Sequence, residues 1–230
     1  MKFLILNRFD PLSPKAAGAE LFTSELASRL VRDGHSVTWF SSQFKGAPSE
    51  DEYKGIKVIR KGNILSVLWW AFRYYMKRKN EFDFVIDEVH AYPFLAKFYV
   101  PKSKRIALVH EVTGKIWYYM APYYTFHLPL GIIGDILERI MYRFFYRSER
   151  FLTVSESTRS ELIKYGVKEK NISVLSEGIT LSSNASKKVE KSEKPQIVYF
   201  GGLRPLKRIE HQLAALKDLK QDFPYLRYLV

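Results

Sequence analysis

Short apolar runs alternate with amphipathic stretches along most of the chain. In the stretches, apolar side chains recur about every three to four residues, as at Ile133, Leu137 and Ile140, which predicts helices. The runs have the length and composition of buried strands. This alternation predicts an α/β fold with a Rossmann-like, doubly wound and mainly parallel sheet. The runs are KFLIL (2–6), SVTWF (36–40), IKVIR (56–60), FDFVID (82–87), KRIALVH (104–110), RFLTVS (150–155), NISVLS (171–176) and QIVYF (196–200).

One stretch interrupts the alternation. Residues 180–195, TLSSNASKKVEKSEKP, have no apolar periodicity and are rich in Ser and Lys, a composition typical of linkers. We therefore expect a domain over residues 1–180, a linker over 181–195 and the start of a second Rossmann-like domain over 196–230. One strand, one helix and the beginning of another strand follow the linker, so the second domain is expected to be truncated.

Composition narrows the choice of partners. The chain of 230 residues has no cysteine, which excludes disulfide bonds and thiolate metal ligands and suits a reducing, cytoplasmic setting. A formal net charge of +13 favours a polyanionic partner, which could be nucleic acid, an anionic lipid surface or a phosphorylated ligand. No nucleic-acid recognition motif accompanies the charge, so we expect no nucleic-acid partner. The longest apolar run, residues 64–72, is far below the ~20 residues that span a bilayer.

Three loops that follow predicted strands carry candidate site residues, because ligands of such folds bind beyond the carboxyl ends of the strands. Gly18 opens a helix whose free N–H groups suit an anion, although the loop before it could equally be an ordinary flexible connection. His110 and Glu111 follow a strand and could bind a polar substrate or be purely structural. The third loop, with Gly201, Arg204 and Lys207, could hold phosphate or be a basic surface turn.

In their order along the chain, five segments resemble glycosyltransferase family 4, the retaining enzymes of GT-B fold. They are AAGAELF, VHEV, RFLTVSESTRSEL, VLSEGI and IVYFGGLRPLKRIEHQLAAL. The resemblance implies two Rossmann-like domains that face each other across a cleft, with a nucleotide-sugar donor held mainly by the second and an acceptor by the first. It also implies sugar transfer with retention, and neither a cofactor nor a bound metal.

The resemblance assigns roles to single residues. Gly18 lies in the loop that approaches the donor, His110 matches the active-site histidine, and Lys207 matches the lysine that neutralises the donor diphosphate. Gly202 stands where the family usually has an arginine, a role that Arg204 could take over.

A Glu-x7-Glu element contacts the donor in the family but has no match in the second domain. Glu161, Glu169 and Glu177 have that spacing in the first domain, where we interpret them as solvated surface charges. We therefore expect the 230-residue chain alone to be inactive. The alternative is a non-catalytic acceptor- or membrane-binding module that acts with a second chain.

Aromatic and basic residues are interleaved in two segments, 64–79 and 115–147. At about 100° per residue, a single helix would align Arg139, Arg143, Arg147 and Arg150 as one basic stripe. Such a stripe beside aromatic rings suits an anionic membrane surface, or it could be the solvated side of a core helix. Many family members act on lipid-linked acceptors, so we expect peripheral binding at the inner face of the cell membrane. Residues 121–131, APYYTFHLPLG, are predicted to form a loop over the acceptor cleft.

Overall fold

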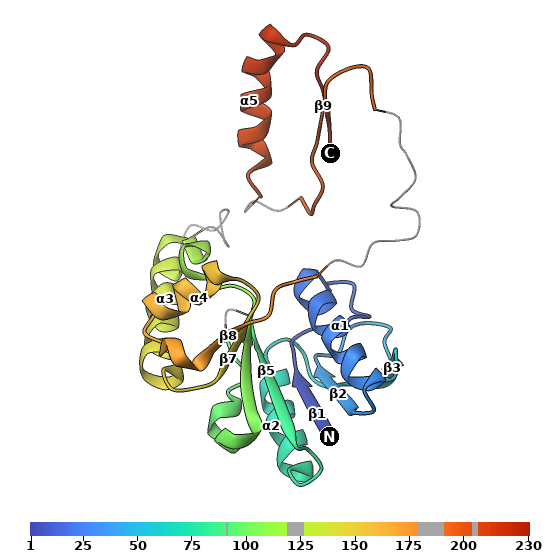
Figure 1. The fold of residues 1–230 in the computed structure, drawn as a ribbon, viewed down its shortest axis with the longest axis vertical. Coiled ribbons are helices and arrows are strands. Elements are labelled where there is room, and N and C mark those ends of the chain that lie inside the picture. The colour runs from blue at the N-terminus through green and yellow to red at the C-terminus, as the bar shows by residue number, and fades with distance from the viewer. Residues whose placement is uncertain (91, 119–126, 179–190, 204–206) are drawn as a thin grey trace. The chain divides into compact units, whose positions relative to one another are not determined.

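The computed structural model describes residues 1–90, 92–118, 127–178, 191–203 and 207–230. Eight strands form one sheet in the order β3-β4-β2-β1-β5-β6-β7-β8 (Figure 1). All neighbouring strands run parallel except β3, which is antiparallel to β4. The predicted α/β, doubly wound parallel sheet is confirmed. The strands are β1 (Lys2–Leu6), β2 (Ser36–Ser41), β3 (Glu50–Tyr53), β4 (Ile56–Arg60), β5 (Phe84–Val89), β6 (Arg105–Val109), β7 (Phe151–Thr153) and β8 (Ile172–Val174).

The winding of the sheet reverses beside β1. From β1 the chain continues to β2 and β4 on one side, and it then returns to β5 on the other. Leu6, the last residue of β1, pairs with Phe40 of β2 and with Asp87 of β5. The connections that leave β1 and β5 turn to opposite sides, so the carboxyl ends of these two strands border a crevice in folds of this kind.

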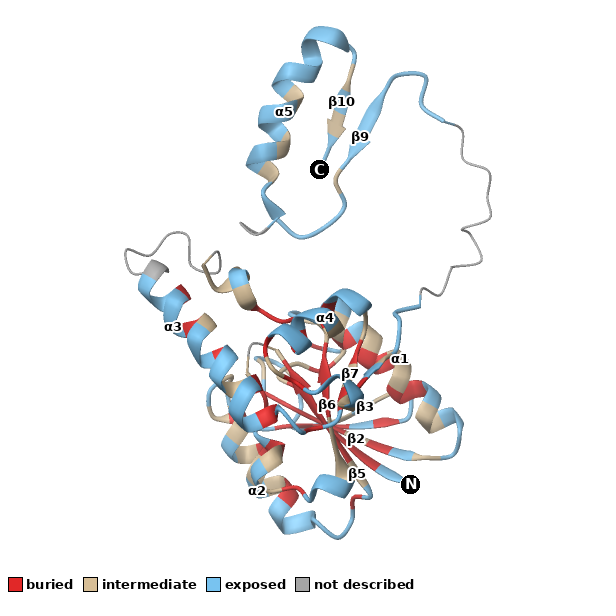
Figure 2. Ribbon diagram, turned by 60° about the vertical axis from the view of Figure 1, so that its left-hand side comes forward, coloured by how far each residue is buried: buried red, intermediate tan, exposed pale blue. Residues whose placement is uncertain are grey.

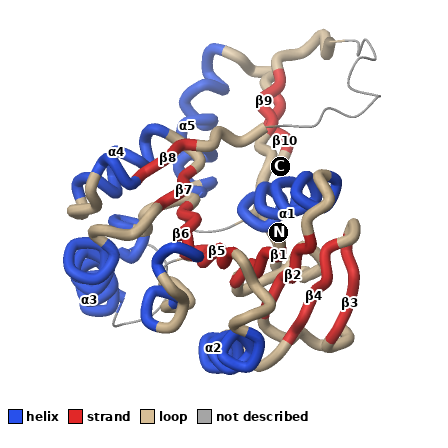
Figure 3. Tube along the Cα trace, turned by 60° about the horizontal axis from the view of Figure 1, so that its bottom comes forward, coloured by secondary structure: helices blue, strands red, loops and turns tan. Residues whose placement is uncertain are grey.

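Helices cover both faces of the sheet (Figure 3). The helix α1 (Gly18–Arg32) packs on one face, where Ala27 joins Phe3 and Ile5 in one core cluster. The helix α2 (Val67–Arg78) packs on the other face with Leu4 and Leu6. Alternate residues of β1 therefore belong to two separate cores, as the two-residue period of a strand requires. Figure 2 shows this buried centre as a band of red strands.

The strand β3 was not predicted. It forms a hairpin with β4 through Lys54 and Gly55, which both have positive φ (50° and 78°). Two such residues in a two-residue connection make the turn that suits the twist of paired strands. The sequence of β3, EDEY, has no buried residue, so its apolar pattern gives no signal.

A long helical segment replaces part of the predicted loop over residues 121–131. Residues 127–131 begin helix α3 (His127–Ile140), so the prediction of a loop there is wrong, while 121–126 lie outside the described residues. Pro129 is compatible with this assignment because proline is tolerated in the first turn of a helix. The helix continues as a π-helix over Met141–Tyr146, whose Tyr142 and Tyr146 are buried against the same face of the sheet as α2.

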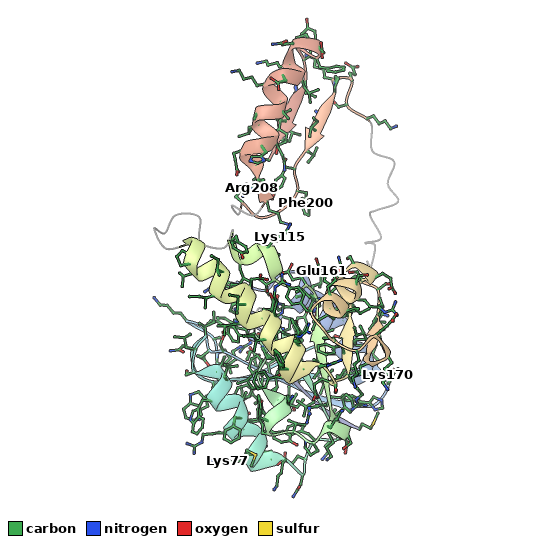
Figure 4. All side chains as sticks on the ribbon, turned by 90° about the vertical axis from the view of Figure 1, so that its left-hand side faces the viewer. Lys77, Lys115, Glu161, Lys170, Phe200 and Arg208 are labelled. Carbon is green, nitrogen blue, oxygen red and sulfur yellow. The ribbon has the colours of Figure 1, made fainter. Side chains whose placement is uncertain are left out.

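The chain divides into two compact units. The first contains Met1–Thr113 and Ile136–Gly178, and the second contains Gly114–Asp135 and Ile179–Val230. In the second, β9 (Gln196–Val198) and β10 (Arg227–Leu229) pair in parallel and α5 (Ile209–Asp222) connects them. No described residue between 191 and 230 is buried, and Phe200, labelled in Figure 4, is 100% exposed.

The remaining helix of the first unit, α4 (Glu156–Lys164), packs beside β7 and β8. Ser155 caps it by accepting a hydrogen bond from the Thr158 amide. Among the described residues, no helix is long and apolar enough to cross a membrane.

A buried ion pair fixes the loop between β1 and α1. The Asp10 carboxylate accepts hydrogen bonds from Arg60 Nε and Nη2, both at 2.8 Å, and both side chains are fully buried. Asp10 also accepts from the Ser41 hydroxyl, and Arg60 also donates to Asp51. These bonds raise the pKa of Arg60, so its charge persists at any working pH. The pair ties the loop that leads into α1 to the strands β2 and β4.

Replacement of Arg60 by Met should destabilise the protein by about 3–5 kcal/mol, because it leaves the Asp10 carboxylate buried without its counter-charge. Urea unfolding followed by circular dichroism measures the change. The matched control is Lys57→Met on the same strand, since Lys57 pairs with Glu50 at 3.2 Å but both side chains are exposed. Equal stability of the two variants would show that the buried pair does not hold this loop.

Candidate functional site

A polar cluster lies at the carboxyl ends of β5 and β6, on the face of the sheet that α1 covers. Glu88 lies two residues after Ile86, which packs in the α1 core, so strand alternation puts Glu88 on that face. Glu88 pairs in register with Leu108 of the same core, and His110 follows two residues later. Three strand-end residues, Glu88, His90 and His110, thereby point toward the first turns of α1.

Glu88 is the centre of the cluster. Its side chain is fully buried, and its Oε1 lies 3.0 Å from His90 Nε2 and 3.3 Å from His110 Nε2. The first of these approaches is a hydrogen bond, whereas the second has ion-pair distance without hydrogen-bond geometry. Burial alone would raise the pKa of Glu88, but the two imidazoles hold it below the ordinary value. The two imidazoles thus favour the ionised form of Glu88.

His90 is the partner that balances this charge. Burial disfavours the protonated imidazole, yet the hydrogen bond and the charge of Glu88 raise the pKa of His90 above its ordinary value. Its backbone carbonyl accepts a hydrogen bond from Arg8 Nη2 at 2.8 Å, and the Arg8 guanidinium lies over the Tyr92 ring. The segment after β5 is thus connected to the loop after β1.

His110 is held from several directions. Its ring stacks on the His90 ring, with centroids 5.7 Å apart and planes 7° from parallel. Phe22 of α1 contacts the ring edge-to-face, and the Thr158 hydroxyl donates to the His110 carbonyl. Glu177 Oε1 lies 3.7 Å from His110 Nδ1. The sequence predicts Glu177 as a solvated surface charge; its side chain is half exposed, and its carboxylate lies beside His110.

The first turn of α1 completes the site. Glu20 Oε2 accepts a hydrogen bond from the Ala17 amide at 2.8 Å, which caps the helix, and Glu20 Oε1 lies 3.8 Å from His90 Nε2. Gly18 is exposed, and a Cβ added to it would meet nothing within 4 Å. The predicted site residue Gly18 therefore borders open space at a helix N-terminus, where backbone N–H groups favour an anion.

The sequence also predicts Glu111, Gly201, Arg204 and Lys207 as site residues. Glu111 is exposed, and it follows His110 directly. Gly201 and Lys207 are exposed residues of the second unit, and Arg204 lies outside the described residues.

The predicted basic stripe is wrong in its geometry. The π-helix at Met141 changes the rotation per residue, and it ends at Tyr146, before Arg150 is reached. Arg150 donates to the carbonyls of Lys102, Ser103 and Arg105, at the amino ends of the strands and away from His110. Arg139, Arg143 and Arg147 are exposed on the helical segment, with Arg139 over the Tyr165 ring.

Sequence reasoning missed Glu20, Glu88 and His90. The signal for two of them was present, because Glu88 and His90 are two residues apart at the end of a predicted strand and must share a face. Glu20 carried no such signal, since an acidic residue in the first turn of a helix is common for electrostatic reasons alone.

Comparisons with known proteins bear on both the family and the fold. A family model described as Glycosyltransferase Family 4 matches residues 16–183. A solved structure of a putative UDP-N-acetylglucosamine 2-epimerase from Listeria monocytogenes is similar over 99% of this chain, with a TM-score of 0.50 and 11% identity. This chain spans 61% of the length of that protein. No curated protein matches the chain.

Proposed function

The chain belongs to glycosyltransferase family 4, and on that premise we propose that it forms the acceptor side of an enzyme that transfers a sugar from a nucleotide-sugar donor with retention. The observation that carries this proposal is the position of His110. It lies at the carboxyl end of β6, beside the open N-terminus of α1 and over a buried carboxylate. Strand ends of this kind are where ligands of doubly wound sheets bind.

Each group has a chemical role in the proposed reaction. The His110 imidazole, packed between Phe22 and His90, contacts the transferring sugar, and Thr158 holds the His110 backbone carbonyl. Glu111, exposed beside it, accepts hydrogen bonds from sugar hydroxyls. The amides at Gly18 meet the donor where its negative charge is concentrated.

Transfer of the sugar leaves negative charge on the departing diphosphate. Cations aimed at that charge lower the barrier, because they interact more strongly with the transition state than with the bound donor. Lys207, Arg204 and the amide of Gly201 are assigned this role in the second unit. We expect residues 1–230 alone to bind a nucleotide-sugar weakly and to transfer no sugar, because a few exposed cations in water are screened and offset little of the entropy lost on binding.

The alternative, a non-catalytic module that binds an acceptor or a membrane beside a second chain, shares the same fold. It requires no role for His110, so a variant at this residue distinguishes the two.

At full natural length, His110→Ala should lower kcat for sugar transfer at least about tenfold, a loss of roughly 1.4 kcal/mol of transition-state stabilisation. Release of nucleotide from a panel of nucleotide-sugars measures the rate, and residues 1–230 alone serve as a parallel sample. His35→Ala is the matched control, because His35 directly precedes β2, at the amino ends of the strands rather than the carboxyl ends that carry the cluster. Unchanged turnover in a folded His110→Ala protein would favour the non-catalytic module.

We propose in addition that the helical segment 130–147 rests on an anionic membrane surface that carries a lipid-linked acceptor. What supports this is the unusual exposure of its apolar side chains, with Ile133 53%, Leu137 59% and Phe144 69% exposed. The same segment carries the exposed cations Arg139, Arg143 and Arg147, so it offers both attractions that hold helices at an anionic interface. The net charge of +13 also favours binding to an anionic surface.

Exchange of Arg139, Arg143 and Arg147 for Glu should abolish co-sedimentation with vesicles of anionic lipid, since each basic residue near such a surface contributes about 1 kcal/mol. The control exchanges Arg29 and Arg32 of α1 and Lys45 of the loop after β2 for Glu, which alters the net charge equally but away from the helical segment. Binding that survives the first exchange in a folded protein, or that both exchanges reduce equally, would contradict a membrane-facing helix. Retention on duplex DNA instead of vesicles would point to nucleic acid.

A further inference from the structure

Arg8 is a half-buried cation just after β1, in the loop that leads to α1. Its guanidinium donates from Nη2 to the His90 carbonyl at 2.8 Å and lies over the Tyr92 ring, 4.2 Å from the ring centroid. Tyr92 is itself fixed, because its hydroxyl donates to the Ile64 carbonyl. The backbone of Arg8 is held as well, since its carbonyl accepts hydrogen bonds from the amide and the hydroxyl of Ser42. The guanidinium is therefore positioned before any ligand binds.

This positioned cation has no counter-charge in the part of the chain that the structure describes. No carboxylate there lies within ion-pair distance of Arg8, and Nη2 alone of its nitrogens donates a hydrogen bond. The acids around it are engaged elsewhere: Asp10 is in the buried ion pair of this loop, Glu20 caps α1, and Glu88 lies against the histidines. A guanidinium has further N–H donors in a planar fork, and partial burial without an anion is unfavourable. The arrangement therefore indicates a ligand with negative charge.

The position of Arg8 puts such a ligand beside the candidate site. The carboxyl ends of β1 and β5 border the crevice of the sheet, and Arg8 follows β1 while His90 follows β5. Burial and, to a smaller extent, the charge of Arg8 act against the raised pKa of His90, so the guanidinium and the imidazole are electrostatically coupled. The His90 ring in turn stacks on the His110 ring. An anion at Arg8 is thus coupled to the histidine pair.

We propose that Arg8 binds a phosphate group of the acceptor, an inference that rests on the proposed sugar transfer and names the acceptor as a phosphorylated molecule. The donor charge is already assigned to the Gly18 amides and to Lys207, which leaves Arg8 for the acceptor. The planar fork of arginine matches phosphate oxygens. Phosphate carries more charge and more acceptor oxygens than a carboxylate, which suits a loop that also carries the exposed Lys15. The same phosphate chemistry occurs in soluble sugar phosphates and in lipid-linked acceptors.

Titration with glucose 1-phosphate tests this without any sugar transfer, because the imidazole NMR signals of the five histidines report where the probe binds. The probe should raise the pKa of His90, since its negative charge offsets that of Arg8. The dissociation constant should be about 1 mM or lower. Arg8→Gln should weaken binding at least about tenfold, because charge-assisted hydrogen bonds to the phosphate are lost. The signals of His35 and His211 should stay unchanged.

The matched control is Arg29→Gln, which removes an exposed cation of α1 and should bind the probe as the parent does. Circular dichroism establishes that each variant is folded, and Arg8→Lys, which keeps the charge but not the fork, should bind with intermediate affinity. Vesicles of phosphatidylcholine that contain polyprenyl phosphate form a second arm. A rise in the pKa of His90 with these vesicles identifies a lipid-linked acceptor, and a rise with glucose 1-phosphate alone identifies a soluble one.

Three results would overturn the role of Arg8. They are equal affinity of a folded Arg8→Gln variant and the parent for both phosphate probes, tighter binding of glucuronate than of glucose 1-phosphate, and a loss in Arg8→Gln that is confined to uridine diphosphate. Phosphate binding at Arg8 in a protein of full natural length that transfers no sugar would contradict the proposed function alone. Sugar transfer to an uncharged acceptor that Arg8→Gln leaves unchanged would contradict the role of Arg8 alone.

Discussion

A buried carboxylate is costly unless nearby groups compensate its charge, and the buried Glu88 carboxylate therefore determines which residues can pack around it. The alternation of β5 turns Glu88 toward α1, where water cannot reach it. His90 and His110 meet the condition because both follow the ends of neighbouring parallel strands. Their rings stack in parallel over the carboxylate, and Phe22 and Glu20 of α1 close the cluster. The histidine that the family resemblance singles out thus lies against an acid that the resemblance did not indicate.

The loop before α1 meets a similar condition through a second buried carboxylate. Asp10 is fixed by Arg60 from β4, so the loop after β1 is held by a strand on the far side of β2. Arg8 in the same loop reaches the His90 carbonyl. The N-terminus of α1 at Gly18 therefore follows a loop that is held in place by these contacts. A ligand that binds there meets amides already in place, which reduces the entropy lost on binding.

Much of the fold could be predicted from the sequence, because buried parallel strands read as apolar runs with helical stretches between them. The apolar pattern did not predict β3, because EDEY forms an edge strand without buried residues and its backbone can pair without an apolar side chain. The sequence did not predict the start of α3 because Pro129 is typical of loops, although proline is also tolerated in the first turn of a helix.

For the site, His110 was identified through the family resemblance. Glu88 and His90 were missed because they lie near His110 only if β5 and β6 are adjacent. Strand order is a property of the whole sheet and cannot be read from the local sequence. Arg150 was misplaced because a π-helix cannot be anticipated from a regular period.

The claim on which this account depends is that Glu88 and His110 work as one unit. A double-mutant cycle on sugar transfer tests it most directly, with Glu88→Gln, His110→Ala and the combined variant compared at full natural length. The account predicts that each single change lowers kcat and that the combined variant is no slower than His110→Ala, because Glu88 acts through the histidine. Additive losses in folded proteins, or full activity of Glu88→Gln, would contradict it.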